Sequence, residues 1–192
     1  MTKDRILSAA KAVLERDGIE GLTIRRVAQR AKLSPMALYR HFADKDALLN
    51  ALMEDGLGAW TDIVRGIRAA DPLEWMEALA EAYLDFALTQ PHRFDAAFFL
   101  PAPAARRFPD DFAAGRSPPV AMVMARIDQA KAEGRLRDTP TLDTALAVAA
   151  FGQGFVSMHR ANRFGSEKQF KALYRAAIRH LFDSLKPSGR TQ

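Results

Sequence analysis

The chain has 192 residues, 48% of them hydrophobic, a formal charge of +5 and no cysteine. This hydrophobic content suffices for a packed core, and the lack of cysteine excludes disulfides and thiolate metal sites. There is no apolar signal core, and the most apolar stretch, Leu142 to Met158, is shorter than the ~20 residues of a membrane span. We therefore expect a globular, cytoplasmic protein without a membrane partner.

The first 45 residues have the spacing of three short helices. The first helix is expected to end near Gly18. The second begins after Thr23, a favourable N-cap residue. Its apolar residues have the spacing of one buried helix face, and they are Ile24, Val27, Ala28 and Ala31. Ser34 and Pro35 then open a third helix as N-cap and first-turn proline.

The third helix is expected to expose an unusual set of side chains to solvent. Leu38 and Phe42 are four residues apart and predict its buried face. The residues turned toward solvent near its start are then Pro35, Met36, Tyr39 and Arg40. Residues 23–45 hold six basic residues and one acidic residue, so this segment carries +5, as much as the whole chain. Such a concentrated basic patch favours binding to nucleic acid phosphates, and recognition helices present their N-terminal residues to the major groove in this way.

The rest of the chain continues with helical periodicity and no strand pattern. A turn of helix is expected near residues 108–114, within a proline-rich loop. Six further helices are expected, and Asp44 is the expected N-cap of the first of them. Their approximate ranges are Lys45–Arg65, Asp71–Gln90, a short aromatic helix that begins at Pro91, Ser117–Gly134, Thr141–Arg160 and Glu167–Lys186. The sequence therefore predicts an all-α fold.

The segment 141–160 is apolar nearly all round, so it must be covered on two sides. Its small residues would let a second helix approach closely. We predict a symmetric homodimer in which the last two helices of each subunit form a four-helix interface. The residues expected there are Leu146, Ala149, Phe151, Gly154, Phe170, Tyr174, Ala177, Ile178 and Leu181. Burial of both sides within a single chain stays open as the alternative.

The C-terminal part holds more aromatic and thioether surface than a small bundle needs. With a few polar groups, this composition suits a largely apolar effector pocket. The candidate lining residues are Trp60, Tyr83, Phe86, Phe98, Phe99, Met122, Arg126, Gln153, Phe155 and His159. Aromatic residues at helical spacing are core more often than pocket, so the core interpretation also stays open.

No catalytic motif is present. The sequence lacks Gly-x-Ser-x-Gly, Gly-x-x-x-x-Gly-Lys and Gly-x-Gly-x-x-Gly, and its four histidines are not spaced for a helix-borne metal site. We therefore expect no enzymatic function, no metal and no cofactor. Two alternatives remain, a small all-helical enzyme and a protein that coats DNA without reading its sequence.

The run from Leu22 to Lys45, with Leu-Tyr-Arg-His-Phe at 38–42 and Asp-Lys-Asp-Ala-Leu-Leu at 44–49, resembles the N-terminal domain of the TetR (tetracycline-repressor-like) regulators over residues 2–52. The resemblance implies a three-helix, helix-turn-helix DNA-binding domain over residues 1–45 and a helical effector-binding and dimerisation domain over residues 46–192. It also implies a repressor that binds a palindromic operator in double-stranded DNA as a dimer, with its two heads ~34–36 Å apart.

In such a regulator, a small-molecule effector in the body would shift the fourth helix and change the separation of the heads. The sequence departs from the family pattern at Lys32, where many members have glycine because the turn requires a positive φ. A lysine in that conformation costs on the order of 1 kcal/mol.

The resemblance also implies roles for individual residues. Those matching backbone-phosphate positions are Thr23, Ser34, Tyr39, His41 and Lys45, and those matching base-facing positions are Arg25, Pro35, Met36, Ala37 and Arg40. Arg25 is the best candidate for a bidentate guanine contact, worth ~1–3 kcal/mol of discrimination. Met36 as a core residue and His41 as a capping or packing residue are the alternatives.

Overall fold

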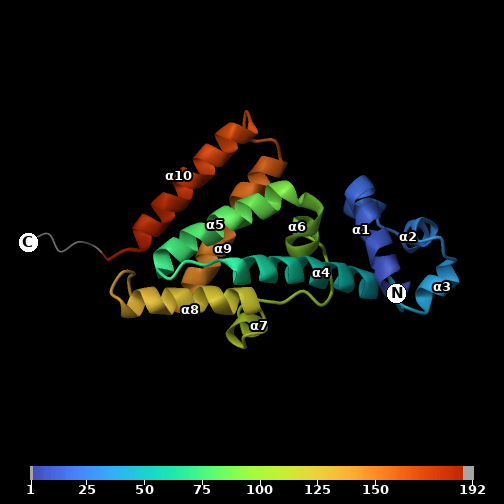
Figure 1. Cartoon of the computed structure of the whole chain (residues 1–192), viewed down its shortest axis with the longest axis horizontal. Helices are drawn as coiled ribbons and strands as arrows, with labels where there is room; N and C mark the ends of the chain where they lie inside the picture. The colour runs from blue at the N-terminus through green and yellow to red at the C-terminus, as the bar shows by residue number, and fades with distance from the viewer. Residues whose placement is uncertain (1, 188–192) are drawn as a thin grey trace, which may run out of the picture. The chain divides into compact units, whose positions relative to one another are not determined.

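The computed structural model describes residues 2–187, which form ten helices and no strand (Figure 1). The helices are α1 (Thr2–Gly21), α2 (Ile24–Arg30), α3 (Pro35–Tyr39), α4 (Lys45–Gly66), α5 (Pro72–Thr89), α6 (Pro91–Phe98), α7 (Asp110–Ala113), α8 (Pro118–Ala132), α9 (Thr141–Arg160) and α10 (Glu167–Leu185). The prediction of an all-α fold is confirmed. A kink at Gly18, where φ is 68°, interrupts α1 at its expected end.

The helix starts follow from side chains that satisfy the first free backbone N–H groups. The Ala37 N–H donates to Ser34 Oγ at 3.1 Å, and the Ala47 N–H donates to Asp44 Oδ1 at 2.7 Å. Thr23 caps α2 in the same way, through the N–H of Arg26 at 3.3 Å. These three predicted caps are confirmed.

The chain forms two compact units. The N-terminal unit contains the residues up to Asp62 together with Thr89–Ala105, and the C-terminal unit contains Ile63–Leu88 together with the residues from Arg106 onward. The N-terminal unit extends beyond residue 45, the last residue of the DNA-binding domain that the family resemblance implies. The reason is that Leu48 and Leu52 of α4, exposed by only 1%, share one core with Ile6, Val27 and Leu38.

Within the N-terminal unit, α6 packs directly against α4. Gly56 lies at this crossing, and a Cβ atom there would be 2.7 Å from the Arg93 carbonyl oxygen and 2.8 Å from the Ala97 nitrogen. Only glycine allows two helix backbones to approach so closely without displacement. Helix α6 also contacts α1, so the three helices surround one region of the unit.

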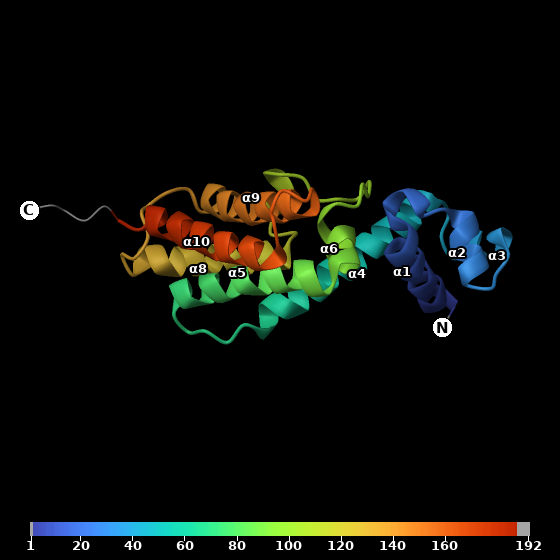
Figure 2. The ribbon, with the colours of Figure 1, turned by 90° about the horizontal axis from the view of Figure 1, so that it is seen from above.

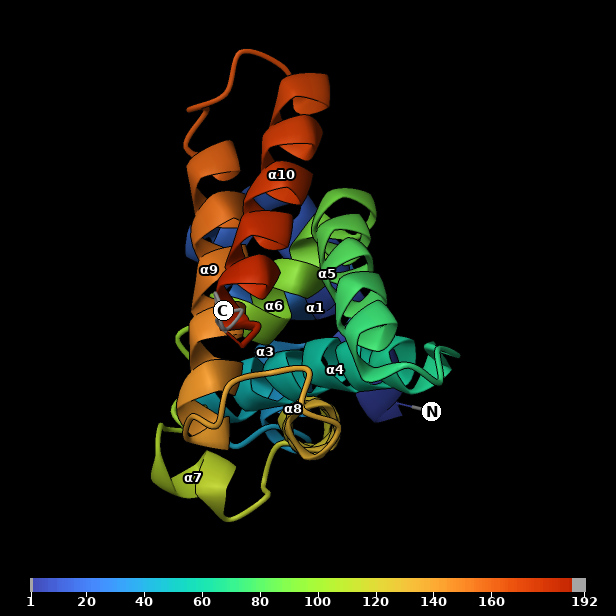
Figure 3. The same ribbon diagram turned by 90° about the vertical axis from the view of Figure 1, so that its left-hand side faces the viewer.

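In the C-terminal unit, α9 contacts both α8 and α10, and Figures 2 and 3 show α9 and α10 side by side. Helix α10 is joined to α5 by the buried Tyr174, whose hydroxyl donates to the Ala80 carbonyl oxygen at 2.9 Å. On the surface, Arg175 forms an ion pair with Glu81 at 2.8 Å. None of the described helices has both the length and the apolar character that crossing a bilayer requires.

Candidate nucleic-acid interface

Helices α2 and α3 are connected by a tight, hydrogen-bonded turn. The Lys32 N–H donates to the Gln29 carbonyl oxygen at 3.1 Å, and the Leu33 N–H donates to that of Ala28 at 2.9 Å. Lys32 itself has a φ of 53°, in the left-handed region that favours glycine. The positive φ that the family pattern implied at this position is confirmed.

Helix α3 has one buried face and one exposed face. Leu38 is fully buried and Phe42 is 3% exposed, whereas Met36 is 72% exposed and Tyr39 is 48% exposed. Pro35 and Arg40 are exposed as well. The predicted orientation of α3 is confirmed, and the alternative that Met36 is a core residue is wrong.

Most of the basic side chains of residues 23–45 form no ion pair with an acidic side chain within residues 2–187. Arg26 is an exception, because it pairs with Asp17 at 3.4 Å. The other basic residues of the segment, which form no ion pair within residues 2–187, are Arg25, Arg30, Lys32, Arg40 and Lys45. All five are exposed. Such a surface attracts a polyanion, and each lysine or arginine that neutralises a phosphate releases counterions.

The predicted phosphate contacts also lie on this surface. Thr23 and Ser34 accept backbone N–H groups as caps, and each hydroxyl keeps its own proton to donate. His41 is exposed, and its backbone N–H donates to the Leu38 carbonyl oxygen at 2.9 Å. Ala37 is partly buried. Nine of the ten predicted contact residues are therefore exposed, as judged over residues 2–187, and they lie on α2, on α3, next to their ends and at the start of α4.

Two family models match most of the chain. Residues 6–52 match the model for bacterial regulatory proteins of the tetR family, and residues 76–181 match the model for the tetracyclin repressor-like C-terminal domain. The second match alone spans more than half of the 192 residues. The chain belongs to the TetR family. This membership places it among transcription regulators and removes the alternative of a small helical enzyme.

Three individual proteins illustrate what the chain is similar to. The chain is 30% identical over 74 residues to the HTH-type transcriptional regulator UidR of Escherichia coli K12, an alignment that spans 36% of this chain and 38% of UidR. A protein of unknown function from Rhodococcus sp. RHA1 superposes with a TM-score of 0.79 and 25% identity over 97% of this chain and 96% of its own. A TetR variant from Acinetobacter baumannii AYE, in complex with minocycline, has a TM-score of 0.67 and 22% identity, covering 93% of both chains.

The residues predicted to line an effector pocket are divided between the two units of this TetR-family fold. Trp60, Phe98 and Phe99 lie in the N-terminal unit, where Trp60 meets Phe98 edge-to-face at 6.2 Å. Those in the C-terminal unit are Tyr83, Phe86, Met122, Arg126, Gln153, Phe155 and His159. The structure therefore does not bring the whole predicted set together in one compact unit.

Part of the set forms an aromatic cluster in the C-terminal unit. The imidazole of His159 stacks on Phe170 with 4.1 Å between ring centroids, and Phe155 meets Tyr174 edge-to-face at 5.9 Å. Phe164 joins the cluster, 5.1 Å from Phe170. Sequence reasoning missed Phe164 because it lies in the loop between α9 and α10, where no helical period marks it.

Other members of the predicted set have structural partners. The guanidinium of Arg126 donates to the carbonyl oxygens of Ala69 and Ala70 and lies over the ring of Trp75, so it holds the segment before α5. Phe86 is 1% exposed and belongs to the core. Burial raises the pKa of Tyr83, which keeps this phenol protonated.

The residues predicted for the dimer interface fall into two groups, one buried and one at least partly exposed. Phe170, Tyr174 and Ile178 are buried within their own protomer, at 0%, 1% and 6% exposure. The members that are exposed or partly exposed are Leu146, Ala149, Phe151, Gly154, Ala177 and Leu181. No charged residue occurs on α9 between Asp143 and His159, and Leu146 is 38% exposed.

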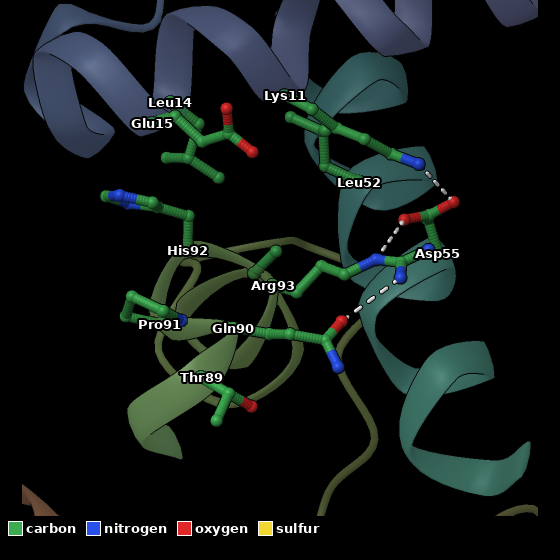
Figure 4. Close-up of a pocket in the computed structure, with 11 residues that line it drawn as sticks. Lys11, Leu14, Glu15, Leu52, Asp55, Thr89, Gln90, Pro91, His92 and Arg93 are labelled. Carbon is green, nitrogen blue, oxygen red and sulfur yellow. Dashed lines mark hydrogen bonds and ion pairs between the residues drawn. The ribbon is translucent and has the colours of Figure 1, made fainter. Parts of the chain in front are cut away.

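A cavity of about 390 Å³ lies among α1, α4 and α6 of the N-terminal unit (Figure 4). At its edge, Asp55 of α4 pairs with Lys11 of α1 at 2.6 Å and with Arg93 of α6 at 3.6 Å. A single carboxylate thus links three helices. The sequence pattern did not single out these residues, because they meet from positions far apart along the chain.

Proposed function

We propose that this chain is a transcription repressor that binds a palindromic operator in double-stranded DNA as a homodimer and is released by a small, largely apolar effector. One observation carries the DNA-binding part. The exposed face of α3 lies next to unpaired basic residues in a segment whose charge equals that of the whole chain. The capped α2–turn–α3 arrangement and the match to the tetR family model support the same function.

The homodimer is supported by the surface of α9 and α10. Leu146 and Met158 on α9 and Leu173 on α10 are exposed by 38%, 48% and 45%. Exposed apolar side chains on adjacent helices favour burial against another protein surface, and an identical surface is the simplest partner. Two-fold symmetry would then match a palindromic operator.

An effector site is supported by the aromatic cluster around Phe155 and His159. The minocycline complex of the TetR variant provides a first ligand to test. An effector can change operator affinity only by its differential affinity for the two states, typically ~1–3 kcal/mol. Binding and release would take place in the cytoplasm, where the operator is accessible.

The test is binding of the purified protein to labelled DNA from upstream of its own coding region. Fluorescence anisotropy is recorded at physiological salt with excess unrelated DNA. We expect nanomolar binding that resists the competitor, at two protomers or a multiple per site. Weak binding that disappears with competitor, followed by a genome-wide selection that recovers no preferred fragment, would instead favour the second candidate, a non-specific DNA coat.

A further inference from the structure

The N-terminal unit exposes two large hydrophobic side chains within its described part, Met36 and Tyr39, and both are on α3. At about 100° per residue, Met36 lies about 200° from Leu38 and about 60° from Tyr39. Leu38 is fully buried. Met36 therefore lies opposite the buried face, beside Tyr39, on the face that the proposed function directs toward DNA.

The first turn of α3 offers no side-chain hydrogen-bond donor, and its one side-chain acceptor is the weak thioether sulfur of Met36. It consists of Pro35, Met36 and Ala37. The N–H of Ala37 is already used by the Ser34 cap at 3.1 Å, and Pro35 has no N–H. The side chains of this turn therefore have no strong hydrogen-bonding group for the donors and acceptors on the edges of base pairs. It presents an apolar contact surface instead, of which the thioether side chain of Met36 is the largest part.

The partner of this apolar surface is indicated by its surroundings. Arg25, Arg40 and Lys45 lie in the same segment, are exposed and form no ion pair within residues 2–187. An apolar protein partner would leave these cations unmatched, whereas duplex DNA supplies phosphates for them. In the major groove the one apolar group on a base edge is the C5-methyl group of thymine.

We propose that Met36 reads the C5-methyl group of a pyrimidine in each operator half-site. This inference rests on the proposed function, because it requires that α3 enters the major groove. The recognised base is then identified by its methyl group and not by a hydrogen bond from the first turn. A 5-methylcytosine carries the same group at the same ring position, so it replaces that thymine better than unmodified cytosine does.

The test begins with selection of bound sequences from random duplexes by the full-length protein. Each thymine of the selected site is then replaced in turn by deoxyuridine, which removes only the methyl group. We expect one symmetric pair of positions at which the wild-type protein loses about fourfold in affinity per half-site, equivalent to the ~0.8 kcal/mol of one buried apolar carbon. In Met36→Ala this loss is absent, and in Met36→Leu it is retained.

Two controls separate base reading from folding. Phe108→Ala removes another exposed apolar side chain, 42% exposed and outside α3, α9 and α10, and keeps the wild-type response to deoxyuridine. Placing 5-methylcytosine at the sensitive position restores part of the affinity lost with cytosine for the wild-type protein and not for Met36→Ala. Circular dichroism melting checks that each variant is folded.

Failure of the inference and failure of the proposed function give different results. A defined operator whose thymines all respond equally in wild-type protein and in Met36→Ala would overturn the inference and leave the repressor function standing. Selection that recovers no preferred sequence would overturn both. Retention of the methyl response in Met36→Ala would assign the contact to another residue and likewise reject the proposal.

Discussion

At the scale of single residues, Lys32 is the one strained position in the α2–α3 turn. Its φ of 53° is costly for a residue with a Cβ atom. We expect Lys32→Gly to raise the free energy of unfolding by about 1 kcal/mol, measured by urea denaturation. Asn162 has the same φ of 53°, and asparagine tolerates it better, so Asn162→Gly is the matched control with a smaller gain. A loss of stability in Lys32→Gly would contradict this account.

Arg25 and Lys45 are expected to contribute differently to DNA binding. Arg25→Ala should relax the preference at one base pair, at a cost of ~1–3 kcal/mol for the preferred base. Lys45→Ala should weaken binding to all sequences and lower the slope of log affinity against log salt by about 1. Anisotropy titrations over a salt series and a set of single-base operator variants measure both. Equal, sequence-independent losses in the two variants would show that these roles are wrongly assigned.

The residue-level predictions that the structure confirms depend on contacts between residues that are close together in the sequence. The caps Thr23, Ser34 and Asp44 act on N–H groups three residues away, so the sequence order alone brings the partners together. Arg126 is the opposite case. Its partners Ala69 and Ala70 are more than 50 residues away, and no pattern near Arg126 indicates them.

At the scale of elements, the crossing of α4 and α6 depends on the glycine at position 56. In Gly56→Ala, the new Cβ would lie 2.7 Å from a backbone oxygen of α6, so the helices must separate. We expect a loss of ~1–3 kcal/mol in the free energy of unfolding, as for other overpacked sites. Urea denaturation monitored by circular dichroism measures it.

Gly58 on the same helix is the matched control. A Cβ there meets no atom within 4 Å, and alanine is the better helix former. Gly58→Ala should therefore gain up to ~1 kcal/mol. If both variants changed stability in the same direction, the close approach at Gly56 would not limit the packing of α6 on α4.

The elements themselves were predictable to within a few residues, and the reason is their clear period. Helix α10 illustrates this. Phe170, Tyr174, Ile178 and Phe182 recur every four residues, and all four are buried on one face. The spacing of these residues does not show which other surface packs against the buried face of α10. The structure places these side chains against their own protomer, so the proposed interface consists of the remaining apolar residues of α9 and α10.

At the scale of the whole molecule, dimerisation is the proposal on which operator binding depends. Leu146→Glu places a charge on the uncharged side of α9, and we expect the variant to sediment as a 21.3 kDa monomer with weakened operator binding. Sedimentation velocity at micromolar concentration measures the change. Phe108→Glu, at a 42% exposed position outside α9 and α10, should leave the dimer intact. A wild-type protein that sediments only as a monomer would refute the proposal.

The sequence by itself determined the all-α fold, the order and caps of the helices, the outward face of α3 and the location of the net positive charge. Each of these depends on neighbours within one or two helical turns. The tertiary structure alone decided that the first unit includes part of α4 and α6, that Trp60 and Phe155 lie in different units, and that Asp55 links three helices. Those features depend on contacts between distant segments, and a local period carries no information about which faces meet.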